Sequence, residues 1–156
     1  MLRVNRLREF VVEVKTAIPA IKYTQVIITN DEFVKFLEER KTSENTLLFA
    51  VIPEHGVTGQ EDKTKYENYL QFFFIDKSAE KDLKHDAKLD LYNKIQNIVS
   101  DFIQLILEAK SGDSDIFESC SMLDELNEES IEIKTFWDGL QCRGYEVLFD
   151  LKTRIS

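Results

Sequence analysis

Cysteine is scarce in this sequence and long apolar runs are absent, and both shortages narrow what the protein can be. The 156 residues include only two cysteines, Cys120 and Cys142, which are too few for a disulfide framework. Reduced, packed thiols are the expected state in a cytosolic chain, with a bond between the two as the alternative. No apolar run approaches the roughly 20 residues that a membrane span requires. Because Glu9, Glu13 and Lys15 also interrupt the region where a signal peptide would be hydrophobic, we expect a cytoplasmic protein with no membrane partner.

Proline and glycine are also rare, at two and five residues, which is unlike the composition of a disordered chain. Apolar residues make up 43% of the sequence and phenylalanine alone occupies 11 positions, so the chain has ample material for a core. A chain of this length most simply forms one domain, residues 1–156, which buries roughly two thirds of the surface that the unfolded chain exposes.

Positive charge is in deficit, and the deficit is uneven along the chain. The net charge is −9; residues 1–41 hold eight Lys or Arg against six Asp or Glu, whereas residues 108–150 hold three against twelve. Such an acidic surface repels phosphate backbones, which argues against sequence-specific binding of nucleic acid. The polarity suits either a protein that stacks on copies of itself, basic end to acidic end, or a solvated acidic face that aids solubility.

Hydrophobic periodicity predicts the order of helices and strands. The best-determined element is a long amphipathic helix at about 87–110, in which Leu91, Ile95, Ile98 and Phe102 lie on one stripe and Gly112 suits the C-terminal cap. Shorter helices are expected at the N-terminus (2–17) and at about 31–40, and a helical turn at 116–126. Strands are expected at residues 22–29, 46–52, 66–76, 130–137 and 145–152, and a long polar surface loop at residues 54–65.

Strands that arrive in hairpins indicate an antiparallel sheet, so the expected fold class is α+β with a sheet of four to five strands. The run at 46–52 is apolar on both faces, which predicts a strand in mid-sheet or covered on both sides. The long helix is expected to cover one face of the sheet, and a short helix part of the other. Asn30 or Asp31 is expected to cap the helix at about 31–40.

Residues that could carry chemistry do not fall into a known catalytic or binding pattern. A zinc site requires paired ligands at short spacings, whereas His55, His85, Cys120 and Cys142 stand singly. Residues 56–64 depart from the phosphate-loop pattern, because the second glycine comes too early and acids occupy the place of the anion. No nucleophile elbow, dinucleotide glycine pattern or zinc-protease helix occurs. We therefore expect no catalytic, cofactor-binding or metal-binding residue, no cofactor and no enzyme activity.

Three other features have an ordinary structural explanation beside a functional one. The acidic cluster of Asp124, Glu125, Glu128 and Glu129 lacks the glycine and alternating spacing of a calcium loop, and it is interpreted as solvated charge. The three phenylalanines at 72–74 have no flanking cations on their strand, so we expect core packing rather than a platform for stacking bases. Trp137 adjoins a turn signal and either folds back onto the core or acts as an interface anchor.

Two segments resemble proteins of a known kind. One precedes the long helix, residues 46–76, TLLFAVIPEHGVTGQEDKTKYENYLQFFFID. The other follows the helix, residues 130–153, SIEIKTFWDGLQCRGYEVLFDLKT. The resemblance is to small proteins of phage-like gene clusters, and these two segments carry it. The order of helices and strands also resembles tail-terminator and head–tail joining (neck) proteins of tailed phages and contractile injection particles. The resemblance rests on this order, on the polar loop, and on the spacing of Trp137, Cys142, Gly144 and Tyr145.

The resemblance implies a non-enzymatic subunit that closes into a ring, commonly of six copies, and caps a tail tube. Its partners would be copies of itself and tail-tube or neck proteins, and DNA would pass through an acidic lumen without being held. Such a protein would be cytoplasmic during assembly and then part of the virion or phage-like particle. The candidate interface residues are Glu54, His55, Gln60, Glu61, Asp62 and Trp137.

Two other hypotheses stay open at this point. One is a cytosolic acidic adaptor or inhibitor whose C-terminal third docks on a basic protein partner. The other is an enzyme with a dispersed carboxylate site, which would need a pocket with two converging carboxylates.

Overall fold

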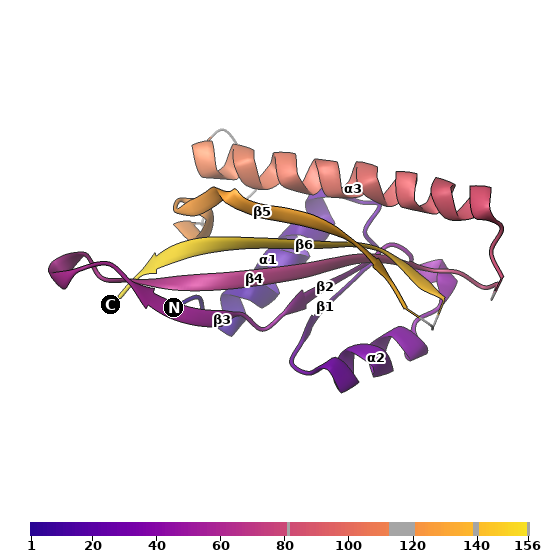
Figure 1. Ribbon diagram of the computed structural model, residues 1–156, viewed down its shortest axis with the longest axis horizontal. Helices are drawn as coiled ribbons and strands as arrows, with labels where there is room; N and C mark the ends of the chain where they lie inside the picture. Colours follow the sequence, from indigo (N-terminus) through magenta and orange to yellow (C-terminus); the bar gives the residue numbers. More distant parts are fainter. Residues whose placement is uncertain (81, 113–120, 139–140, 156) are drawn as a thin grey trace.

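The computed structural model describes residues 1–80, 82–112, 121–138 and 141–155, and Figure 1 shows a long sheet with helices on both of its faces. In chain order the elements are α1 (Val4–Ala17), β1 (Tyr23–Ile27), α2 (Asn30–Glu39), η1 (Thr42–Glu44), β2 (Leu47–Val51), β3 (Glu54–Thr58), η2 (Glu61–Lys63), β4 (Lys65–Lys77), α3 (His85–Ser111), η3 (Ser121–Leu123), β5 (Leu126–Trp137) and β6 (Cys142–Arg154). Here α denotes an α-helix, η a short 3₁₀ helix and β a strand.

The fold is α+β, as predicted, and within the described ranges its sheet has six strands. Their order is β1-β2-β4-β6-β5, with β3 paired to β4 outside this path. All neighbouring strands are antiparallel except β1 and β2, which are parallel. The sheet is therefore mixed rather than purely antiparallel, because helix α2 carries the chain back to the end of the sheet where β1 began.

One face of the sheet packs against α1 and α3, and this is the larger core. Phe10 of α1, Phe72 of β4 and Phe102 of α3 meet here with ring centroids 5.4 to 6.3 Å apart, and none of the three is exposed to solvent. Burying each such side chain contributes roughly 1.5–3 kcal/mol. The position of the long helix across one face is as predicted, and Gly112 ends it in the left-handed conformation with φ 78°.

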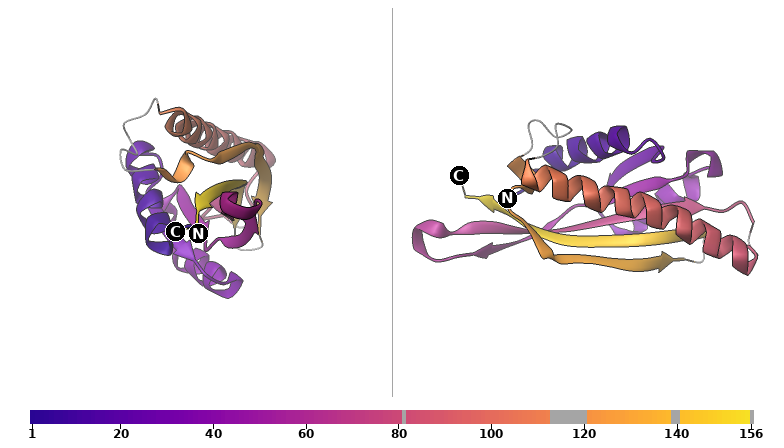
Figure 2. Two further views of the ribbon diagram at one scale, coloured as in Figure 1. Left: turned by 90° about the vertical axis from the view of Figure 1, so that its left-hand side faces the viewer. Right: turned by 90° about the horizontal axis from the view of Figure 1, so that it is seen from above.

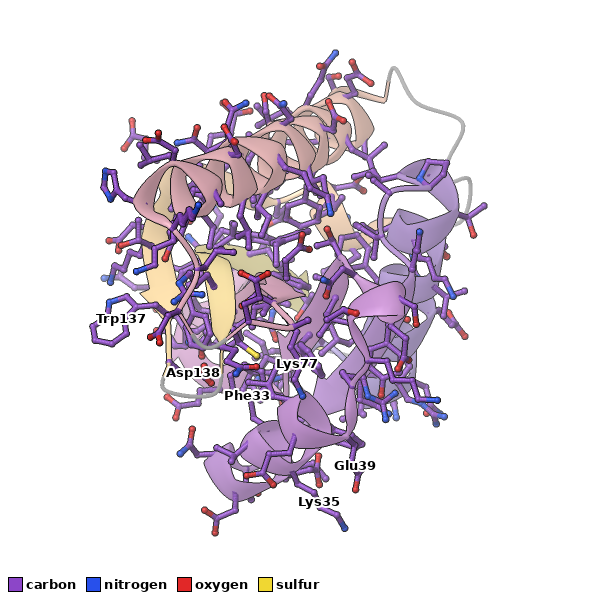
Figure 3. The ribbon with its side chains drawn as sticks, turned by 90° about the vertical axis from the view of Figure 1, so that its right-hand side faces the viewer. Phe33, Lys35, Glu39, Lys77, Trp137 and Asp138 are labelled. Carbon is purple, nitrogen blue, oxygen red and sulfur yellow. The ribbon has the colours of Figure 1, made fainter. Side chains whose placement is uncertain are left out.

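Helix α2 covers part of the opposite face and forms a second, smaller core with it. Phe33 lies between α2 and the sheet, with its ring centroid 4.8 Å from that of Phe73, while Lys35 and Glu39 lie on the outer side of the helix (Figure 3). The helix is capped by Thr29, whose hydroxyl accepts a hydrogen bond from Glu32 N at 3.2 Å. The predicted cap at Asn30 or Asp31 is wrong by one or two residues, because Thr29 keeps the extended backbone that a capping residue requires.

The strongly apolar segments of the sequence are strands at the centre of the sheet, which are buried on both faces. Strand β2 lies between β1 and β4 and is covered on both sides: Leu48 and Ala50 belong to the larger core, and Leu47 and Phe49 to the smaller one. The phenylalanines at 72–74 are likewise divided between the two cores, which confirms that they are packing residues. No stacking platform for bases exists there.

One prediction about the chain path is wrong. Residues 54–65 form strand β3 and the 3₁₀ turn η2 rather than a loop. Every side chain of β3 is at least partly exposed, so the strand has no apolar pattern; its backbone pairing to β4 holds it instead. Of the helical turn predicted at 116–126, residues 116–120 lie outside the described residues. The remainder forms η3 and the start of β5.

Candidate functional site

The first candidate surface is the hairpin of β3 and the start of β4, residues 54–69, which we call the hairpin arm; β6 pairs with the other edge of β4 along it. It extends beyond the helices at one end of the molecule in two perpendicular views (Figures 1 and 2). The arm brings together five of the six predicted interface residues: Glu54 and His55 in β3, Gln60 before η2, and Glu61 and Asp62 within it. All five are exposed. The sequence therefore predicted correctly that these residues lie at the surface but assigned them the wrong secondary structure.

The base of the hairpin arm is fixed by the buried amide of Asn68. The Oδ1 atom of Asn68 accepts from Leu2 N at 2.8 Å and lies 2.8 Å from His55 Nδ1, while its Nδ2 atom donates to Leu151 O and to Thr153 Oγ1, both at 3.1 Å. Both lone pairs and both amide hydrogens are thus engaged. One side chain ties the segment before α1, β3 and β6 to β4.

The tip of the arm is also well defined. Gly59 has φ +104°, and a Cβ added there would lie 2.5 Å from Lys63 O, so only glycine fits this turn. The Thr64 hydroxyl donates to Glu61 O at 2.7 Å and closes the η2 turn. Just after this turn, Lys65 Nζ lies 2.6 Å from a carboxylate oxygen of Glu125. The arm is a preformed projection rather than a tether.

The sixth predicted interface residue, Trp137, lies at the opposite end of the sheet. It pairs with Arg143, which in turn pairs with Asp76 of β4, and Asp76 stands eleven residues after Lys65 near the tip of the arm. At about 3.3 Å per residue this is roughly 35 Å. Trp137 is 73% exposed and points away from the body (Figure 3), so it does not fold back onto the core. Its neighbour Phe136 packs on Phe73 instead, at 5.2 Å between centroids.

An apolar groove of about 520 Å³ runs between α3 and the edge strand β5. Its apolar lining comes from Val99, Ile103 and Leu107 of α3, Ile133 of β5 and Tyr145 of β6. Ile133 is 50% exposed, although it is an aliphatic residue in a strand. Sequence reasoning missed this groove. The available signal was the apolar stripe of α3, which includes Ile103 and Leu107 and is wider than contact with one sheet face requires.

The part of the sheet face that α2 leaves uncovered is acidic. Burial raises the pKa of Asp150 above its ordinary value, and the nearby carboxylates of Glu67 and Glu132 raise it further. The carboxylate of Glu67 is also the main cause that raises the pKa of Tyr69. These groups repel one another at neutral pH.

The acidic cluster predicted to be solvated is partly engaged in ion pairs. Glu125 pairs with Lys65, as described above, and Glu128 lies 3.2 Å from Lys110 Nζ at the end of α3. The carboxylates of Glu128 and its neighbour Glu129 remain largely accessible on β5. They are available to a partner without first losing a buried contact.

The histidines and the described cysteine lie apart from one another in the described part of the chain. His85 is exposed at the start of α3, in a different element from His55. Cys142 is buried, and burial is the main cause that raises its thiol pKa to about 12, so the thiol stays protonated at neutral pH. Cys120 lies outside the described residues. Over the described ranges, no three His, Cys, Asp or Glu side chains come together as metal ligands would.

In residues 1–80, 82–112, 121–138 and 141–155, no helix is both long enough and apolar enough to cross a membrane.

Comparisons with known proteins add little to this description. No protein-family model matches the chain. Nesprin-2 of Homo sapiens is 28% identical to it over 83 residues, which are 53% of this chain but 1% of that protein. The chain thus spans about one hundredth of the length of this relative, and the match assigns neither a family nor a function.

Proposed function

We propose that this protein is a non-enzymatic structural subunit of a phage or phage-like particle, a tail terminator or neck component that assembles into a homo-oligomeric ring. The observation that supports the proposal is the pair of unlike exposed surfaces, the hairpin arm at one end and Trp137 with the α3–β5 groove toward the other. The order of helices and strands that resembles tail-terminator and neck proteins supports it as well.

Unlike surfaces favour head-to-tail association. When surface A of one copy binds surface B of the next, the copy at each end of the chain keeps one free surface until the chain of contacts closes into a ring. A tail terminator would present its ring to tail-tube or neck proteins, and six copies is the number that the resemblance implies. The net charge of −9 suits a lumen through which DNA slides without adhering.

Two exposed aromatic side chains at these surfaces are of the types that dominate binding energies. Trp137 is 73% exposed and Tyr69 43%. Tryptophan and tyrosine are enriched among residues whose truncation costs an interface 2 kcal/mol or more. A single large contact of this kind is enough to make assembly sensitive to one substitution.

Light scattering coupled to size-exclusion chromatography tests the proposal. The wild-type chain is expected to show a mass several times that of the monomer, increasing with concentration toward one closed species. Trp137→Ala is expected to raise the dissociation constant about 10-fold or more. A shortened arm, with residues 59–64 replaced by Asn-Gly, keeps the Thr58–Lys65 pair and is expected to weaken assembly similarly.

Val12→Ala is the matched control, because Val12 is 55% exposed on α1 and belongs to neither surface. It should assemble like the wild type. A monomer at every concentration, with and without tail-tube or neck proteins, would refute the proposal.

The alternative function is that of a cytosolic acidic adaptor or inhibitor that binds a basic protein. The uncovered sheet face with Glu67, Glu132 and Asp150 favours it, because a cation placed there would relieve the repulsion between these carboxylates. Capture of a basic partner that is lost in Glu67→Gln/Glu132→Gln, by a chain that stays monomeric, would favour this function over the ring.

A further inference from the structure

We infer that the two unlike surfaces meet by strand addition: β3 of one copy pairs with the free edge of β5 of the next, and Val57 enters the α3–β5 groove. This inference rests on the proposed ring and specifies its interface.

The first observation is the state of the two strand edges. Among the described residues, β5 pairs only with β6 and β3 pairs only with β4, so each has one edge without a neighbouring strand. Unpaired edges present rows of N–H and C=O groups that pair readily with another strand. Strand β5 is twelve residues long, which is ample for the five residues of β3.

The second observation is the match of apolar side chains. Val57 is 66% exposed at the middle of the hairpin arm, and Ile133 is 50% exposed at the margin of the groove. Neither side chain is fully buried in the core of its own chain. An aliphatic side chain beside Ile133 would also contact Ile103 and Leu107 of α3, and the groove volume of about 520 Å³ leaves room for it.

The third observation is charge complementarity. Lys63 and Arg154, with Lys65 and Lys152, line a hollow of about 540 Å³ beside the tip of the arm, and the acidic residues Asp62 and Glu125 line it as well. The side of β5 carries Glu128, Glu129 and Glu132, and Glu108 lies on the rim of the groove. The internal pairs that Glu128 and Glu132 form, with Lys110 and Lys134, are solvent-exposed and therefore weak, so an incoming lysine can replace them.

The two surfaces are also separate, so one copy can use both at once. By strand register Val57 stands level with Tyr66 of β4, whereas Ile133 stands level with Val147 and through it with Phe72. Six residues along β4 correspond to roughly 20 Å. A second copy of the chain therefore fits the groove without blocking the arm of the first, which is the requirement for a ring.

Cysteine cross-linking tests the inference directly. In a Cys120→Ser background, Val57→Cys and Ile133→Cys chains are mixed and oxidised. We expect a cross-linked dimer from the mixture and none from either variant alone. When both substitutions are in one chain, oxidation is expected to give a ladder on a denaturing gel whose last rung is the number of copies in the ring. Val12→Cys paired with Ile133→Cys is the control and should give no dimer.

A charge exchange provides the second measurement. Lys63→Glu and Glu132→Lys are each expected to raise the dissociation constant about 5-fold or more, and a mixture of the two variants to regain most of the affinity. An assembled wild type that gives no cross-link between positions 57 and 133 and no recovery in the charge exchange overturns the strand-addition inference while leaving the ring intact. A wild type that does not assemble at all overturns both.

Discussion

Asn68 and His55 form a hydrogen bond in which the imidazole Nδ1 is the donor. The Asn68 Nδ2 atom already donates to Leu151 O and Thr153 Oγ1, so the Oδ1 atom 2.8 Å from His55 Nδ1 can act only as an acceptor. This relationship fixes the tautomer of an exposed histidine. It also gives that histidine a structural role, because its Nδ1 proton is donated to a buried neutral amide.

Replacing Asn68 tests how strongly the hairpin arm is held. Asn68→Ala leaves Leu2 N and Leu151 O without their partner in a buried position, and we expect the free energy of unfolding to fall by roughly 2–4 kcal/mol. Urea denaturation measures the change. His55→Ala removes one hydrogen bond at an exposed residue and should cost less than about 1 kcal/mol. Equal effects of the two substitutions would contradict the central position of Asn68.

Asp76 is the second buried polar residue whose partners define a test. One of its carboxylate oxygens accepts from the Thr46 hydroxyl at 2.7 Å, and the other lies 2.7 Å from Lys94 Nζ. Asp76→Ala leaves the buried hydroxyl unpaired and is expected to destabilise the fold by about 1–3 kcal/mol. Lys94→Ala, whose side chain is half exposed, should cost about 1 kcal/mol or less. Thermal denaturation of both variants at neutral pH measures the difference.

Gly144 allows β6 to approach β4 closely. A Cβ at this position would lie 1.8 Å from Phe74 O, a backbone atom that cannot move aside, so Gly144→Ala is expected to destabilise the protein by several kcal/mol or to prevent folding. Gly112→Ala is the control, since no atom lies within 4 Å of its added Cβ and only the left-handed backbone is strained, at about 1 kcal/mol. Soluble yield and circular dichroism of the two variants compare them. A normal fold in Gly144→Ala would contradict the strand register.

Because the pKa of Asp150 is raised in the folded state, we expect the stability of the protein to depend on pH. Its pKa is raised in the folded state by burial and then by Glu67 and Glu132, so over the pH range between its ordinary and its raised pKa the folded chain binds a proton that the unfolded chain has released. Stability therefore falls as pH rises through this range, and the cost is fully present above it. Asp150→Asn is expected to raise the melting temperature at pH 7 and to change it little at a pH below the ordinary range of carboxyl groups. A lower melting temperature at pH 7 would contradict the repulsion between these carboxylates.

Some of these features were accessible from the sequence and others were not. The long helix and strand β2 were predictable because periodicity and double-sided apolarity report burial directly, as Phe102 and Phe49 illustrate. Strand β3 was not, because its stability comes from backbone pairing to β4 and leaves no pattern in residues such as Glu54 and Gly56. The parallel β1–β2 pair depends on how α2 returns the chain, which local patterns do not encode.

The candidate surfaces show the same division. The exposure of five of the six candidate interface residues was predictable because a polar, glycine-containing stretch marks an exposed segment. Trp137 required the structure: its strand alternates regularly, and only the position of β5 at the edge of the sheet shows that Phe136 faces the smaller core and Trp137 faces solvent. The groove beside Ile133 depends on the distance between α3 and β5, which is a feature of the tertiary structure and leaves no local sequence pattern.

Negative-stain electron microscopy of the purified wild-type chain tests the central claim, head-to-tail assembly through unlike surfaces, most directly. The account predicts closed rings of uniform size that are absent in Trp137→Ala and present in Val12→Ala. Uniform monomer-sized particles at high protein concentration, or symmetric pairs that persist in Trp137→Ala, would contradict it.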